Sequence, residues 1–198
     1  MLSNNILSSI TGTVSSDAAI VEVNGREYKS ITVIAKRLGG YEDEVEVLVD
    51  INQQPFDTGT RVRVVGFLFA YYLDGHIRVC LYSLGIIRVK TLNDKNLIMC
   101  AGTVTRPPVL RKSPAGKTIC ELMIAVNNEL NEIHSSYIPC IAWNNVAESA
   151  SNLPIGTKIL IAGRLQSRKY VKQFSDTESE TRTAKELSVN SFNLLTEV

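Results

Sequence analysis

The stretch GTKILIAGRL, residues 156–165, repeats GTRVRVVGFL, residues 59–68. Ahead of it, KNLIMCAGTV (residues 95–104) resembles NNILSSITGTV (residues 4–14). Matching glycines lie at nearly constant spacing in the sequence: Gly12 and Gly102 are 90 residues apart, and Gly66 and Gly163 are 97 residues apart. The repeat indicates two copies of one fold, the second with a short insertion before its GT strand.

Each copy is predicted to contain five short strands. In the first copy, an Asn-Gly pair between AIVEV and EYKSITVIAKR is typical of a β-hairpin turn. In the second copy the insertion predicts a short helix from Val146 to about Asn152, capped by Asn144 or Asn145 and stopped before Pro154.

Five strands with a helix between the third and fourth is the order of an OB-fold barrel. We therefore expect an all-β fold of tandem five-stranded OB-fold barrels, with a short helix in the second barrel. The expected domains are residues 1–90 and 91–198. A single long β-sandwich is the alternative, and the repeat argues against it.

The segment GRLQSRKY, residues 163–170, carries cations directly after an apolar run. Side chains of a strand alternate between two faces, so Leu165 falls on the core face. The opposite face holds Arg164, Gln166, Arg168 and Tyr170. Guanidinium groups bind phosphates and aromatic rings stack on bases, so this row is a candidate nucleic-acid contact. A solvated strand end is the alternative.

Charge is unevenly distributed along a chain whose net charge is +1. Residues 95–172 contain ten Lys and Arg against four Asp and Glu, whereas residues 1–90 contain nine against ten. This excess of positive charge suggests that the second half meets a polyanion.

Several function classes are not supported by the sequence. His76 and His134 fall one in each copy, and no metalloprotease, nucleotide-binding or serine-hydrolase motif is present, so we expect no enzyme. The acidic run YEDEVEV (residues 41–47) is interpreted as a solvated strand face. Four separated cysteines without a C-x-x-C pair predict buried, reduced thiols and no metal or cofactor. No secretion signal or membrane span is recognised, so a cytoplasmic location is expected.

Three segments resemble the bacterial single-stranded-DNA-binding protein family: NLIMCAGTVTRPPVLRKSPAGKTICELMIAV, SYIPCIAWNNVAESASNLPIGTKILIAGRLQSRKY and ELSVNSFNLL. The resemblance extends over essentially all of residues 95–195. The resemblance implies base-stacking roles for Tyr137, Trp143 and Tyr170. A tryptophan in the core is the alternative for Trp143. The cations around these rings are expected to neutralise phosphates, with Arg111 and Lys112 in a flexible connection. They are Arg106, Arg111, Lys112, Arg164, Arg168 and Lys169.

The first copy departs from this pattern. Phe67, Phe69 and Tyr71 occupy the positions of Arg164, Gln166 and Arg168. An exposed aromatic row predicts either self-association, which we favour, or an auxiliary contact with DNA. The family typically assembles four barrels, which a dimer of this chain would supply.

The sequence therefore predicts a protein that binds single-stranded DNA without sequence preference and protects it during replication, recombination or repair. Its expected partners are the DNA, a second copy of the chain and, as an open possibility, replication proteins, with no membrane partner. The alternative is a primosome-type interaction module that docks replication proteins and binds nucleic acid only secondarily.

Overall fold

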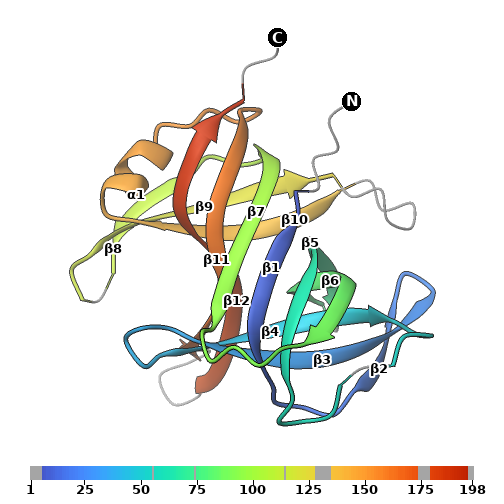
Figure 1. Ribbon diagram of the computed structural model, residues 1–198. Helices are drawn as coiled ribbons and strands as arrows, with labels where there is room; N and C mark the ends of the chain where they lie inside the picture. The colour runs from blue at the N-terminus through green and yellow to red at the C-terminus, as the bar shows by residue number, and fades with distance from the viewer. Residues whose placement is uncertain are drawn as a thin grey trace.

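In the computed structural model the chain forms two β-barrels side by side (Figure 1). Described are residues 6–54, 56–73, 75–113, 115–127, 135–173 and 179–195; for residues 168–173, 179–182 and 184 the description is limited to the backbone. The predicted all-β fold with one short helix in the second copy is confirmed.

The first barrel consists of β1 (Ser8–Val14), β2 (Ala19–Val23), β3 (Arg26–Lys36), β4 (Glu42–Asp50), β5 (Arg61–Leu73) and β6 (His76–Arg88). The barrel closes in the order β1-β3-β4-β6-β5-β1, in which only β4 and β6 are parallel. The hairpin of β2 and β3 turns at Asn24 and Gly25, whose φ angles are 49° and 75°. This is the turn that the Asn-Gly pair predicts.

The second barrel repeats this arrangement with β7 (Lys95–Val104), β8 (Val109–Lys112), β9 (Thr118–Val126), β10 (Ser136–Trp143), α1 (Asn145–Ala150), β11 (Lys158–Gln173) and β12 (Ser179–Leu194). It closes in the order β7-β9-β10-β12-β11-β7, with β10 and β12 parallel. The helix is shorter than predicted. Asn144 occupies its N-cap position, but its side chain makes no capping hydrogen bond. No helix in the described part of the chain is long and apolar enough to span a bilayer.

Each copy has six strands, one more than predicted. Five strands close each barrel, and the sixth is a short strand, β2 or β8, that pairs only with the following strand. Arg111 and Lys112 therefore lie in β8 and not in a flexible connection, because they pair with Ile119 and Thr118 of β9.

A glycine at the same place in each copy lets one strand bend out of its barrel. Pairing shifts by one residue at Gly66 in β5 and at Gly163 in β11. A Cβ atom at these positions would collide with the carbonyl oxygens of Tyr82 and Ser188. Beyond the shift, β5 and β11 continue as long hairpins with β6 and β12.

The two barrels are joined by strand pairing and by these hairpins. Strands β1 and β7 pair antiparallel, with Ser9 opposite Leu97, so β6-β5-β1-β7-β11-β12 is one continuous sheet (Figure 1). In addition, the β11 hairpin packs against β4 of the first barrel, and β5 contacts β10 of the second. The inward rows of both barrels belong to one buried apolar cluster. The result is one folded body in which each hairpin reaches the neighbouring barrel.

Candidate nucleic-acid interface

The outer face of the second barrel over β8, β9 and β10 holds the two described aromatic residues predicted to stack on bases. Tyr137 is 48% exposed and Trp143 is half-buried. Their neighbours Ile138 and Ala142 point inward and are fully buried. Because the two positions are six residues apart on one strand, the rings lie about 20 Å apart along β10. The alternative of a tryptophan in the barrel interior is not supported, since Trp143 lies on the strand face opposite that core.

Cross-strand pairing groups further side chains around these rings. Trp143 is opposite Ile119, which is opposite Arg111, so these three form one row across β10, β9 and β8. Tyr137 is opposite Ala125 of β9. Pro139, which lies between the two aromatic residues along β10, is opposite Met123. The face thus offers aromatic and flexible apolar side chains on which bases can stack.

The cations at the edge of this face are held by weak, exposed contacts. The Arg111 guanidinium donates to the carboxylate of Glu121, and both side chains are partly exposed. Lys112 Nζ donates to Thr118 Oγ1 at 2.6 Å. Arg106 is exposed just after β7. Surface pairs of this kind contribute little to stability, so a phosphate can replace them at small cost.

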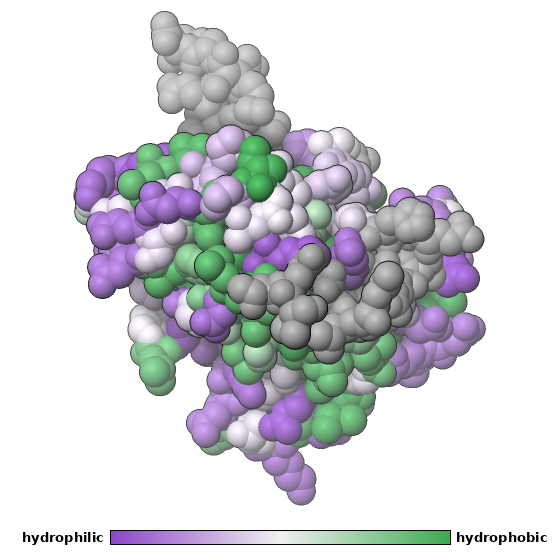
Figure 2. All heavy atoms as spheres, turned by 90° about the horizontal axis from the view of Figure 1, so that it is seen from above, coloured by the Kyte–Doolittle hydropathy of each residue, from purple (hydrophilic) through white to green (hydrophobic). Residues whose placement is uncertain are grey.

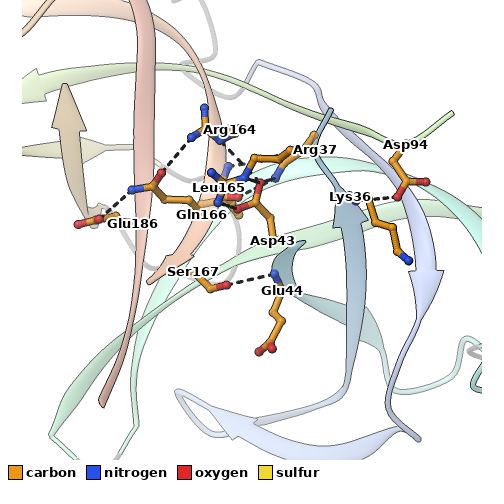
Figure 3. Close-up of polar contacts among 11 residues, drawn as sticks. Lys36, Arg37, Asp43, Glu44, Asp94, Arg164, Leu165, Gln166, Ser167 and Glu186 are labelled. Atoms are coloured by element: carbon orange, nitrogen blue, oxygen red, sulfur yellow. Dashed lines mark hydrogen bonds and ion pairs between the residues drawn. The ribbon is translucent and has the colours of Figure 1, made fainter. Parts of the chain in front are cut away.

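Arg164 lies in a different environment from the one predicted. Its Nε is 3.7 Å from Oδ2 of Asp43 in β4, and its Nη2 donates to Gln166 Oε1 at 3.1 Å (Figure 3). Burial lowers the pKa of Arg164, the nearby Arg37 lowers it further, and Asp43 acts in the opposite direction. The outer face of β11 therefore meets the first barrel here, and the Arg164 side chain is 27% exposed. Contact of Arg164 with nucleic acid stays a prediction.

Asp43 is the centre of the junction between the barrels. Its side chain is fully buried and accepts two hydrogen bonds from Arg37, at 2.7 and 3.0 Å. Asn96 of β7 donates to the same carboxylate at 3.4 Å and also bonds both backbone groups of Leu165. Sequence reasoning missed Asn96, although a polar residue at the start of the apolar run NLIMCA was a visible signal.

The next outward residue of β11, Gln166, is more deeply buried than Arg164. Gln166 is 5% exposed and donates to Glu186 of β12 at 2.9 Å. The remaining predicted residues of this row are Arg168 and Tyr170, with Lys169 between them. They belong to β11, but their side chains lie outside the described residues.

The aromatic row of the first barrel is not exposed as predicted. Phe69 and Tyr71 are 4% and 5% exposed and pack with Leu48 and Cys80 in a second apolar cluster, while Phe67 is half-buried. The Tyr71 hydroxyl donates to Glu46 at 2.6 Å. Burial, followed by this contact with Glu46, raises the pKa of Tyr71. Phe69 and Tyr71 stabilise the interior of this chain, and their rings are not exposed for self-association.

The acidic strand is only partly solvated. Glu42 and Glu44 are exposed, as expected, but Glu46 is 8% exposed. Glu46 accepts from Ser30 at 3.0 Å and lies 3.6 Å from Nζ of Lys185 in β12. Among the described residues, no group of three or more His, Cys, Asp and Glu is arranged to hold a metal ion.

The family is shown by a model of the Single-strand binding protein family, which matches residues 95–195. Because the match covers half of the chain, the chain belongs to this family. Membership confirms the resemblance derived from the sequence and agrees with the expectation of a binding protein without enzymatic activity.

Individual relatives agree with this assignment. Single-stranded DNA-binding protein 2 of Listeria innocua is 35% identical over 80 residues, which are 38% of this chain and 50% of the relative. Single-stranded DNA-binding protein A of Bacillus subtilis is 34% identical over 83 residues, 39% of this chain and 48% of the relative. The chain therefore spans about half the length of the curated relatives it matches.

Solved structures extend the likeness to both barrels. The wild-type single-stranded DNA binding protein from Thermus aquaticus is similar with a TM-score of 0.71 at 18% identity, over 98% of this chain and 95% of that chain. A deletion mutant of the same protein gives 0.70 at 20% identity, over 100% and 98%. At this identity the likeness concerns the fold.

Proposed function

We propose that the chain binds single-stranded DNA without sequence preference and coats exposed strands during replication, recombination or repair. The observation that carries this proposal is the open outer face of β8, β9 and β10. There Tyr137 and Trp143 flank Met123, and two cations of β8, Arg111 and Lys112, lie at the edge. Every base has a π face, so stacking of this kind does not depend on sequence. A cytoplasmic location is part of this proposal, because the protein would act on DNA.

The division of labour that we propose follows the repeat. Residues 91–198 supply this face, and residues 1–90 form a divergent barrel that supports it. The boundary is suggested by the connection between β6 and β7, where Arg61 binds Asp94 at 2.6 Å and Thr91 at 3.0 Å.

The proposal is tested by titrating the protein with a thymidine oligonucleotide while the fluorescence of Trp143, the single tryptophan, is recorded. We expect quenching and an affinity that falls steeply between 50 and 200 mM salt, because phosphate binding releases counterions, roughly in proportion to the number of phosphates contacted. An affinity independent of salt would contradict the cationic part of the site. No binding by a folded protein would instead favour the module that docks replication proteins.

We further propose that two copies pair through the outer face of the continuous sheet β6-β5-β1-β7-β11-β12. Leu7, Leu84 and Ile87 are each more than half exposed there, and Leu97 and Met99 are half-buried. Figure 2 views the molecule from above and not onto this sheet, and there hydrophobic residues are interspersed with hydrophilic ones. A wide apolar sheet face of this kind favours a symmetric partner.

The pairing is tested by light scattering on Leu84→Asp/Ile87→Asp. We expect the mass to fall from two chains to one, whereas Leu38→Asp, in the fully exposed turn between β3 and β4, should leave it unchanged. An unchanged mass in the double variant would exclude this face as the interface.

A further inference from the structure

The two barrels allow a comparison position by position. Val14 of β1 pairs with Val33, and Val104 of β7, its counterpart in the repeat, pairs with Ile124. On the next strand Val33 pairs with Val45 of β4, and Ile124 pairs with Ile138 of β10, so Val45 corresponds to Ile138. By the same register Glu44 corresponds to Tyr137, and Asp50 corresponds to Trp143.

The two barrels carry different kinds of side chain at these matched positions. Where the second barrel has two aromatic rings, the first has two exposed carboxylates, Glu44 and Asp50. Between them, Glu46 stands at the position of Pro139. Neither a base-stacking ring nor a phosphate-binding cation occupies the outward positions of β4, so this face repels a polyanion.

Acidic residues of β4 also form ion pairs with cations of the second barrel. Asp43 lies against Arg164, and Glu46 lies against Lys185. Glu44 donates its backbone N–H to Ser167 of β11, while its carboxylate points away from the junction (Figure 3). Strand β4 thus places negative charge beside the β11 hairpin, where this hairpin packs against the first barrel.

We propose that the first barrel does not bind the DNA strand, and that the exposed carboxylates Glu44 and Asp50 confine the strand to the β8-β9-β10 face of the second barrel. This inference rests on the proposed function. Its consequence is that one chain occupies the length of strand that one barrel covers, although it contains two barrels of the same fold.

The test compares two double variants at matched positions, Glu44→Gln/Asp50→Asn in the first barrel and Tyr137→Ala/Trp143→Ala in the second. The amide at position 50 retains an oxygen that can accept the bonds Asp50 receives from Asn52 at 2.9 and 3.1 Å. Anisotropy of a fluorescein-labelled thymidine oligonucleotide reports affinity and nucleotides bound per chain without the tryptophan. Thermal melts establish that both variants are folded.

We expect Tyr137→Ala/Trp143→Ala to weaken binding by about 5- to 150-fold for each ring. Glu44→Gln/Asp50→Asn should tighten binding about two- to fivefold at 50 mM salt and have no effect at 0.5 M salt, because repulsion between exposed charges is screened. The unsubstituted chain should bind the number of nucleotides that one barrel covers.

Weaker binding by Glu44→Gln/Asp50→Asn would overturn the proposal, because it would place the strand on the first barrel. Unchanged affinity at 50 mM salt would also overturn it, since the carboxylates would then not confine the strand. Both results differ from a failure of the proposed function, which would appear as absent binding by the unsubstituted chain.

Discussion

Asp43 of the first barrel and Arg164 of the second face each other across the junction, with Oδ2 and Nε 3.7 Å apart. The carboxylate is fully buried and Arg37 binds it through two further hydrogen bonds. A buried carboxylate between two guanidinium groups fixes the β11 hairpin against β4. The junction therefore depends on a charge that cannot be solvated when its partners are removed.

Asp43→Asn is expected to lower the free energy of unfolding by about 3–5 kcal/mol, because it leaves two partly buried cations without their anion. Urea denaturation measures this loss. Glu42→Gln is the matched control, since Glu42 pairs with Lys36 at 3.3 Å on the surface and should cost less than about 1 kcal/mol. Equal losses in the two variants would show that the junction is no more than a surface contact.

The outer apolar cluster of the first barrel gives a second test. Phe69→Ala should lower the free energy of unfolding by about 3–5 kcal/mol, because it leaves a cavity beside Tyr71 and Leu48. Tyr72→Ala, at a ring that is 66% exposed, should change it by about 0.5 kcal/mol or less. Thermal and urea unfolding of both variants check this contrast. If the Phe69→Ala variant is as stable as the unsubstituted chain, the result would support the exposed aromatic row that the sequence predicted.

The alternation of side chains along the strands predicted correctly which side chains point inward or outward, but it did not predict which outward side chains are exposed to solvent. Leu165 points into the core at 3% exposure, and Arg164 points outward, as the period of two requires. Which surface the outward face meets depends on the other barrel, more than 100 residues away in sequence for the pair Asp43 and Arg164. Phe69 is outward but buried for a different reason, because it packs with Leu48, Tyr71 and Cys80 of its own barrel.

The repeat was more informative than any single motif. It predicted two barrels and the matching of Gly66 with Gly163, because both copies keep the residues that close a barrel. The pairing of β1 with β7 was not predictable, since a free strand edge carries no signal for its partner. Tyr137 and Trp143 were correctly predicted to share a face because alternation within one strand is a local property.

The two kinds of contact in the proposed interface should be separable by salt. Tyr137→Ala is expected to cost roughly 1–3 kcal/mol of binding free energy with little change in the salt dependence, because stacking neutralises no phosphate. Arg111→Ala should reduce the slope of log affinity against log salt by about one phosphate contact. Titrations at several salt concentrations measure both quantities. The assignment of Arg111 to phosphate binding is contradicted if its variant retains the full slope.

Stability at high pH should depend on the buried cysteines. Burial raises the pKa of the Cys100 thiol from 9.0 to about 12, and the pKa values of Cys80 and Cys140 also rise. Above pH 9 the unfolded chain loses these protons while the native chain keeps them. The free energy of unfolding should therefore be unaffected below pH 9 and fall between pH 9 and 12.

The measurement is urea denaturation at pH 8 and pH 10 for the unsubstituted chain and for Cys100→Ala. The substitution should remove about 1.4 kcal/mol of the loss at pH 10, the value of one pKa unit. A loss of the same size in both proteins would assign the alkaline effect to other groups.

Gly163 is expected to be among the least tolerant positions of the second barrel. A methyl group there would collide with the Ser188 carbonyl oxygen and press on Leu187 at the point where β11 leaves the barrel. Gly163→Ala should therefore lower the free energy of unfolding by about 1–3 kcal/mol, because the backbone of β12 has to move. It should also weaken the docking of the β11 hairpin on β4, since the bend aims Arg164 at Asp43.

Gly85→Ala is the control, because a Cβ at Gly85 meets no atom within 4 Å. Urea denaturation of the two variants measures the difference, and protease resistance of the hairpin reports the docking. If both alanines are tolerated equally, the bend at Gly163 does not need a glycine and the junction is formed by the side chains alone.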